Sequence, residues 1–353
     1  MPPAEEEPPI LESEVAYAIR RMKPGTAPGP DGFSADLLRA GGFRKNFSCM
    51  DQIQTVPQLI ERSREYHIPL VLVFMDYRKA FDSVEINAVL NALVHAGVPS
   101  PYVQLLDECF SNTSTTIQLF DRKLTIPIEK GVRQGDTISP KLFTAALQDA
   151  MKNLDWDAKG YPVDGKRISN LRFADDIVLI SNSTAEAEEM LSELDMAGRK
   201  IGLDMNMSKT QFMVSQWCDT GLVKLNGVAL QRVDSYVYLG RELNMENDLA
   251  PEIARRRRAA WAAFSSIREV TDQVKDAGLR ASIFNASVLP AMCYATETWP
   301  DNKAVAKAMQ TTHRALERCF LKTSLRQQRQ QGIRSSELRE KSQLADPLQY
   351  MCQ

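Results

Sequence analysis

Two adjacent acidic residues occupy the centre of a β-hairpin pattern. Residues 173–176 read Phe-Ala-Asp-Asp, between the strand-like runs Ile168–Leu171 and Ile177–Ile180. Neighbouring carboxylates that leave water lose hydration and repel each other. Ala-Asp-Asp also lacks the Asn-Gly or Asp-Gly of a favourable hairpin turn, whereas carboxylates are good ligands for divalent cations. The hairpin therefore predicts a metal site, and with it a nucleotidyl-transfer enzyme or the descendant of one.

Charge is segregated along the chain. The 353 residues have a net charge of −2, which argues mildly against a nucleic-acid enzyme. However, residues 1–19 carry five Glu and no Lys or Arg, whereas residues 313–342 carry eight Lys or Arg against three Glu. The six cysteines are scattered without a C-x-x-C pair, which is typical of reduced thiols. No run is long and apolar enough to span a membrane. These features predict an intracellular protein, cytoplasmic and/or nuclear, with no membrane partner.

The residue patterns predict an α+β fold in which a mostly antiparallel sheet is backed by helices. The expected strands include a buried central strand, a hairpin around Asp121–Lys123 and the acidic hairpin, and comprise 70–75, 115–120, 124–129, 168–181, 210–214 and 222–240. The expected helices comprise 11–22, 50–66, one capped by Ser83, 139–154, one with a Ser183…Glu186 capping box, and most of the chain from Leu249 onward. Residues 24–32 are expected to form a loop.

A third aspartate ends the predicted central strand. Asp76 follows the apolar run Leu70–Met75, so that its carboxylate can face a cleft beside Asp175 and Asp176. Two-metal phosphoryl transfer needs such shared carboxylates, because one metal activates the attacking hydroxyl and the other steadies the leaving pyrophosphate. Asp76 alone could equally be a helix cap. The three acids together favour catalysis.

A glycine-containing loop, residues 131–140, precedes a predicted helix. Its sequence is Gly-Val-Arg-Gln-Gly-Asp-Thr-Ile-Ser-Pro. Glycines let the backbone approach a ligand closely, and a helix N-terminus favours anions. Taken alone, this segment could also be an ordinary helix-capping loop.

In order along the chain, three motifs resemble motifs A, B and C of non-LTR, RTE-like retrotransposon reverse transcriptases. They are Asp-x-x-x-Ala-Phe-Asp at 76–82, Arg-Gln-Gly-Asp-x-x-Ser-Pro at 133–140 and Phe-Ala-Asp-Asp at 173–176. The resemblance extends to 202–210 and to the primer-grip motif at 236–240. Upstream, residues 23–32 and 42–48 resemble finger motifs. The resemblance as a whole implies a polymerase palm with truncated fingers and a helical C-terminal thumb region.

The resemblance also implies roles for individual residues. Asp76, Asp175 and Asp176 would be the catalytic acids and would bind Mg²⁺ or Mn²⁺, with Asp76 and Asp175 as the metal-binding pair and Asp176 as the third acid. The incoming dNTP would contact Tyr77, Phe81, Gln134, Gly135 and Lys209, and Phe81 would be the aromatic gate that excludes a ribose 2′-OH. The RNA template and DNA primer would contact Arg133, Tyr238, Leu239, Gly240, Arg255 and Arg256.

Alternatives remain for single residues: Phe81 could be a core aromatic, Lys209 a solvated cation, and Arg255–Arg258 a solvated helix face. Trp261 and Trp299 are expected in the core.

The implied domains are a leader with a fingers remnant (1–42), a fingers and palm core (43–215), a primer-grip hairpin (216–246) and a basic thumb (247–353). The family places about a hundred residues between the two finger motifs, and here Gly41 leads directly into Gly42. The absent stretch includes a basic finger motif in this family, and without its cations the triphosphate would be less well stabilised. The alternative function is therefore a weak or inactive retroelement remnant that at most binds nucleic acid. An RNA-dependent RNA polymerase is disfavoured by Phe81 and by the lack of Gly-Asp-Asp.

Overall fold

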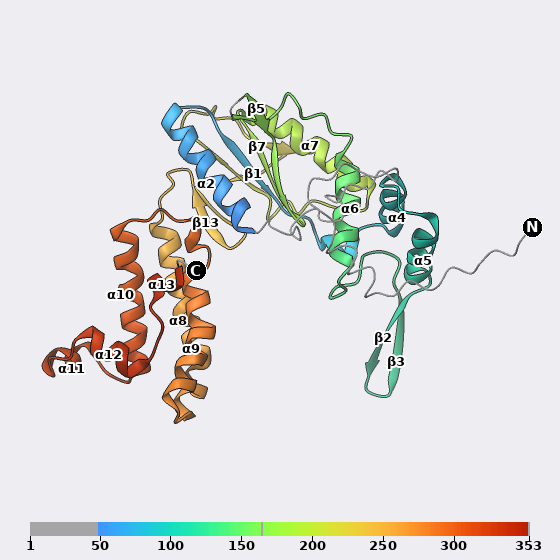
Figure 1. Cartoon of the computed structure of the whole chain (residues 1–353). Helices are drawn as coiled ribbons and strands as arrows, with labels where there is room; N and C mark the ends of the chain where they lie inside the picture. The colour runs from blue at the N-terminus through green and yellow to red at the C-terminus, as the bar shows by residue number, and fades with distance from the viewer. Residues whose placement is uncertain (1–48, 164, 352–353) are drawn as a thin grey trace, which may run out of the picture. The chain divides into compact units, whose positions relative to one another are not determined.

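The computed structural model describes residues 49–163 and 165–351, which divide into two compact units (Figure 1). One unit contains residues 68–232, and the other contains residues 50–67 and 233–351. The boundary therefore falls inside the predicted 216–246 segment. The predicted 1–42 domain, helix 11–22, loop 24–32 and finger motif 42–48 lie outside the described residues.

A five-stranded sheet forms the centre of the first unit. Its strand order is β11 (Gln231–Arg232), β8 (Gln211–Val214), β1 (Val71–Met75), β7 (Asp176–Ser181) and β6 (Asn170–Phe173). Neighbouring strands are antiparallel, except that β11 runs parallel to β8. The predicted mixed fold with an antiparallel sheet and a central strand ending at Met75 is confirmed.

Strand β1 lies in the middle of this sheet, between β8 and β7, and every residue in it is buried. Val73 pairs with Leu179 and Met75 pairs with Ile177, so these side chains share one face of the sheet. That face belongs to a core that includes Leu191 and Leu194 of α7 (Thr184–Lys200). The apolar packing fixes the register, because a slip of one residue would move each side chain to the other face.

Helices α3 (Ala80–Ser83), α4 (Ile86–His95), α5 (Ser100–Phe110) and α6 (Ser139–Met151) complete this unit. The predicted cap at Ser83 is wrong, because the Ser83 hydroxyl donates to the Arg78 carbonyl and α4 begins after Glu85. Ser183 does cap α7 by accepting from the Glu186 amide.

This unit also contains three separate two-stranded sheets. They are β2 (Ser114–Leu119) with β3 (Arg122–Pro127), β4 (Tyr161–Val163) with β5 (Lys166–Ile168), and β9 (Lys224–Leu225) with β10 (Val228–Ala229). The β2–β3 hairpin projects away from the five-stranded sheet (Figure 1). In this hairpin, Leu119 pairs with Arg122, so the turn is Phe120–Asp121 and lies slightly before the predicted position. Asn226–Gly227 forms the turn between β9 and β10.

The second unit is largely helical, as predicted for the C-terminal region. Its helices are α2 (Cys49–Tyr66), α8 (Ala250–Gln273), α9 (Ala277–Cys293), η1 (Thr296–Thr298), α10 (Lys303–Phe320), α11 (Leu325–Gln330), α12 (Ser335–Ser342) and α13 (Pro347–Met351). The hairpin of β12 (Ser235–Tyr238) and β13 (Arg241–Asn244) belongs to the same unit. None of the helices within the described ranges is long and apolar enough to cross a membrane.

Aromatic packing forms the core of the second unit. The Phe284 ring lies 6.0 Å from Phe264 and 5.5 Å from Phe320, both in edge-on contacts. Trp299 is buried in the same core and Trp261 packs against it, as predicted. Helix α2 adds an ion pair between Arg64 and Glu246, with 3.6 Å between the nitrogen and oxygen.

Candidate active site

The acidic hairpin turns at Ala174 and Asp175, because Phe173 pairs with Asp176 across β6 and β7. Ala174 has a positive φ of 54°, a conformation that costs a non-glycine L-residue about 1–2 kcal/mol. The turn places Asp175 at the tip and Asp176 at the start of β7. Since Met75 pairs with Ile177, Asp76 follows β1 at the position next to Asp176. The sheet register thus brings the three predicted catalytic acids to one end of β1 and β7.

Burial makes this group of acids costly. Burial and the charges of Asp175 and Asp76 raise the pKa of Asp176 to about 6. Burial also raises the pKa of Asp175, and Asp76 contributes to that increase. Carboxylates that resist ionisation in this way would be stabilised by a bound cation.

Lys209 supplies a positive charge to this end of the sheet. Its Nζ lies 3.4 Å from Oδ2 of Asp76, and its side chain is 66% exposed. The loop that carries it is fixed next to Asp76, whose backbone carbonyl accepts from the Asn206 amide at 2.8 Å. The structure therefore places Lys209 beside Asp76. Its predicted contact with a triphosphate stays a prediction.

The carboxylate oxygens of the site suit a divalent cation, although the acids are not gathered around a single ion position. Oδ2 of Asp76 is buried without a hydrogen bond, while Lys209 lies close to it. Across the described ranges, no three His, Cys, Asp or Glu side chains are spaced to hold one ion together. Asp76 and Asp175 are therefore the candidate ligands, and their side chains would have to converge on the ion.

The glycine-containing loop binds directly to the segment after β1. The amide of Val132 donates to the Phe81 carbonyl at 2.7 Å, and the amide of Gly131 donates to the Val84 carbonyl at 2.8 Å. Gln134 Nε2 donates to Asp82 Oδ1 at 2.9 Å. The loop is therefore held against the segment that carries Phe81, with Gln134 bound to Asp82, and the predicted contacts of Gln134 and Gly135 with a nucleotide stay predictions.

Phe81 lies on α3 and stacks on Phe143 of α6, with ring centroids 4.6 Å apart. Phe143 is fully buried, whereas Phe81 is only partly buried. The Phe81 ring therefore packs on the buried Phe143 ring, and part of the Phe81 side chain is exposed to solvent. This position is compatible with both interpretations of Phe81, a nucleotide gate and a core aromatic.

Tyr77 lies in the core, where it is only 3% exposed. A Cβ added to Gly198 of α7 would lie 2.9 Å from the Tyr77 hydroxyl, so the two residues are in close contact. Burial, with a further contribution from Asp195, raises the pKa of Tyr77. The position of this side chain does not support its predicted contact with a nucleotide.

Arg133 is exposed, but its guanidinium is attached to α5. It donates to the Cys109 carbonyl at 2.9 Å and lies 5.8 Å from the centre of the Phe110 ring. Contact with a template would require this arginine either to leave α5 or to use its remaining donors.

In the second unit, the primer-grip motif forms a tight turn between β12 and β13. Leu239 and Gly240 both have positive φ, at 44° and 82°, while Tyr238 pairs with Arg241. The Tyr294 hydroxyl donates to the Leu239 carbonyl at 2.8 Å. Arg256 donates to the Gly240 carbonyl at 3.1 Å, and Arg255 donates to the same oxygen. The backbone of the turn is thus fixed by α8 and by Tyr294, which directly follows α9.

Arg255 and Arg256 are directed into the protein. Their common partner is Glu252, which is fully buried, with 2.9 Å between its Oε1 and Nε of Arg256. Arg256 itself is only 7% exposed. The position of Arg256 does not support its predicted contact with template–primer phosphates, because the guanidinium pairs with a buried carboxylate and donates to the turn. Arg257 and Arg258 are the exposed members of the basic run.

Sequence reasoning did not identify Glu252, Tyr294 and Arg241 as parts of this turn. Arg241 is buried and donates to the Thr298 hydroxyl at 2.6 Å. The spacing of Glu252 to Arg255 and Arg256, three and four residues, was the available signal, because such pairs face each other on a helix.

Gly131 allows one test of the loop. A Cβ at this position would lie 2.7 Å from the Asp82 backbone, and its φ is 89°. We expect Gly131→Ala to lower the free energy of unfolding by about 3 kcal/mol, through backbone strain and the clash together. Gly135→Ala is the matched control, since Gly135 has a φ of 88° but open space around it. It is expected to cost about 1 kcal/mol. Equal losses in urea unfolding would contradict the close packing at Gly131.

Comparisons with known proteins identify the family of this chain. The family model of reverse transcriptase (RNA-dependent DNA polymerase) matches residues 36–243. A transposon-derived protein of Caenorhabditis elegans is 42% identical over 193 residues, which cover 54% of this chain and 69% of that protein. The Pol polyprotein of the type-1 retrotransposable element R2 from Nasonia vitripennis is 30% identical over 170 residues, 48% of this chain and 16% of the polyprotein.

Among solved structures, telomerase from Candida tropicalis is similar at a TM-score of 0.44 and 13% identity, covering 83% of this chain and 50% of that one. The chain spans less than a third of the retrotransposon polyproteins that it matches. The family match covers more than half of the chain and includes all three acids. This chain belongs to the reverse transcriptase (RNA-dependent DNA polymerase) family, with relatives among non-LTR retrotransposon polyproteins.

Proposed function

We propose that this chain is the RNA-directed DNA polymerase of a non-LTR retrotransposon, which adds dNTPs to a primer 3′-OH on an RNA template. The observation that carries the proposal is the convergence of Asp76, Asp175 and Asp176 at one end of β1 and β7. Bound Mg²⁺ or Mn²⁺ would supply activation of the hydroxyl and neutralisation of the leaving pyrophosphate. Asp76 and Asp175 would hold the metal, and Asp176 would add negative charge.

The protein's own residues would orient the substrates. Lys209 is exposed enough to move from Asp76 to a triphosphate once a metal neutralises that carboxylate. Gln134, oriented by Asp82, would contact the incoming nucleotide together with Gly135. The exposed Arg257 and Arg258 are better placed than Arg256 for primer or template phosphates. Tyr238, Leu239 and Gly240 would position the primer end.

One observation favours the alternative, a nucleic-acid-binding chain without turnover. The ion pair between Lys209 and Asp76 already neutralises one candidate metal ligand. A direct test is extension of a DNA primer on an RNA template with dNTPs and Mg²⁺ or Mn²⁺, with EDTA as the blank. Polymerase activity predicts product only with metal. Binding of the duplex without any product would support the alternative.

Phe81→Val tests the gate. Its smaller side chain would leave room under the sugar, so preference for dNTPs over rNTPs is expected to fall by about tenfold or more. Phe81→Tyr keeps the ring on Phe143 and should keep the preference. The measurement is single-nucleotide incorporation with matched dNTP and rNTP. Unchanged discrimination in Phe81→Val would assign Phe81 to the core alone.

A further inference from the structure

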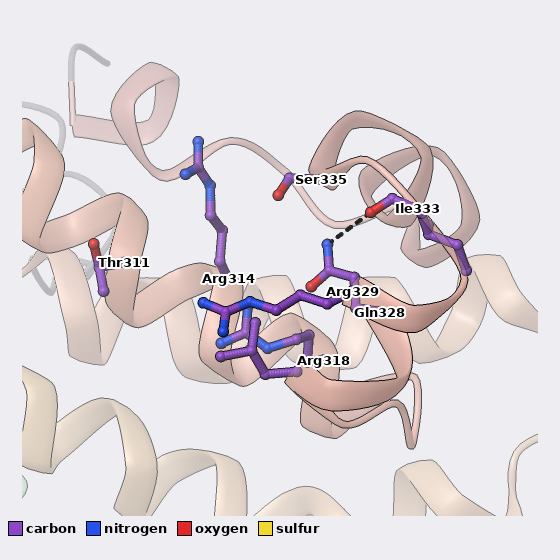
Figure 2. A pocket seen from close by; sticks show the side chains of 9 residues that line it. Thr311, Arg314, Arg318, Gln328, Arg329, Ile333 and Ser335 are labelled. Carbon is purple, nitrogen blue, oxygen red and sulfur yellow. Dashed lines mark hydrogen bonds between the residues drawn. The ribbon is translucent and has the colours of Figure 1, made fainter.

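A pocket of about 410 Å³ lies in the C-terminal part of the second unit. It is lined by α10, α11 and the start of α12, and Figure 2 shows the side chains around it. Three of the lining residues are arginines: Arg314 and Arg318 on α10, and Arg329 on α11. The volume is in the range of small-ligand sites. None of these residues takes part in the proposed polymerase activity.

Among the residues that the structure describes, these arginines have no acidic partner. Within the described part of the chain, no carboxylate lies within ion-pair distance of Arg314, Arg318 or Arg329. Two acids of this segment pair with Arg339 instead, which lies 2.8 Å from Glu317 and 3.0 Å from Asp346. Arg314 and Arg318 are also four residues apart on one helix, where like charges are unfavourable. The pocket therefore carries an uncompensated positive charge.

The frame of the pocket is fixed by local hydrogen bonds. Gln328 is buried, and its Nε2 donates to the Ile333 carbonyl at 3.2 Å, as Figure 2 shows. Ser324 and Gln327 form a capping box that starts α11 and so positions Arg329. Gly332, at the edge, has no atom within 4 Å of where a Cβ would lie. The three arginines thus lie on two helices, α10 and α11, around a pocket whose edge at Gly332 is open.

We propose that this pocket binds the phosphate groups of a nucleic-acid backbone. Planar guanidinium groups bind phosphate oxygens through paired hydrogen bonds. The Ser335 hydroxyl, which also lines the pocket, can donate a further hydrogen bond. The surrounding residues 313–342, with eight Lys or Arg against three Glu, suit a long polyanion better than one small anion. The inference rests on the proposed function, since that function supplies the nucleic acid.

The test compares two double variants of the full chain that remove equal charge. Arg318→Ala with Arg329→Ala removes two arginines of the pocket. Arg326→Ala with Arg334→Ala removes two exposed arginines of the same segment that do not line it. Binding of a fluorescein-labelled RNA–DNA primer–template is measured by anisotropy without dNTPs, after thermal unfolding shows that both variants fold. The pocket variant should bind about tenfold more weakly, with a shallower salt dependence, and the control within about twofold.

Equal weakening of both double variants would overturn the pocket and leave only a general charge effect. Inorganic phosphate is titrated at constant ionic strength as a competitor. If it binds the wild type but the pocket variant keeps full duplex affinity, the pocket is a small-anion site and the inference fails. Primer extension by the same proteins separates the two proposals. If the wild type extends the primer but both double variants bind the duplex equally well, only the pocket proposal is refuted. If the pocket variant alone loses binding and the wild type extends no primer, only the polymerase proposal is refuted.

Discussion

Asp76→Asn is expected to reduce primer extension on an RNA template by about a thousandfold, the scale at which a group that stabilises transition-state charge acts. Asp76 ends the central strand, and its Oδ2 is buried without a hydrogen bond, with Lys209 Nζ 3.4 Å away. An amide cannot replace a carboxylate as a ligand for two positive metal ions. Lys209 would also lose its partner. The rate of single-nucleotide addition is the measurement.

The same substitution is expected to leave the fold intact. Asn removes one of three crowded negative charges, and the Lys209 side chain of the ion pair that it breaks is 66% exposed. The free energy of unfolding in EDTA should therefore change by no more than about 1 kcal/mol. Asp204→Asn is the control, because Asp204 is exposed on the neighbouring loop and should keep nearly full activity. A folded Asp76→Asn protein with more than a tenth of the wild-type rate would exclude Asp76 from catalysis.

Glu252→Gln is expected to destabilise the second unit strongly. Glu252 is fully buried between Arg255 and Arg256, and its Oε2 accepts from the Glu242 amide at 2.8 Å. Glutamine can still accept that hydrogen bond, but it leaves buried guanidinium charge uncompensated. Breaking a buried pair in this way typically costs about 3–5 kcal/mol. The measurement is urea unfolding followed by tryptophan fluorescence.

The control for this prediction is Glu269→Gln, an identical substitution at an exposed position on the same helix, α8. It should change the free energy of unfolding by less than about 0.5 kcal/mol. Because Arg255 and Arg256 hold the Gly240 carbonyl, Glu252→Gln should also weaken positioning of a primer end. Equal stability of the two variants would mean that Glu252 does not hold the turn.

The central strand and the acidic hairpin could be predicted from sequence because local rules decide them. Residues 71–75 are apolar throughout and end sharply at Asp76, and Asp175 and Asp176 stand out against their neighbours. The register of β1 with β7 then follows from burial, and it is this register that brings the acids together.

The orientations of the Tyr77, Arg255 and Arg256 side chains could not be predicted, because segments distant in sequence determine them. Tyr77 is covered by Gly198 of α7 and bridges to Met205, neither of which is near it in sequence. Arg255 and Arg256 face inward because the β12–β13 turn presents a backbone carbonyl to them. A basic run alone does not reveal which faces of its helix will find partners.

The most direct test of the central claim, that Asp76, Asp175 and Asp176 form a polymerase active site, is single-nucleotide extension of a DNA primer on an RNA template. Wild-type chain and Asp175→Asn are compared at equal concentration with the templated dNTP and Mg²⁺ or Mn²⁺. The proposed function predicts a templated, metal-dependent product from the wild type and none above background from the variant. A folded, duplex-binding wild type that makes no more product than Asp175→Asn would contradict it.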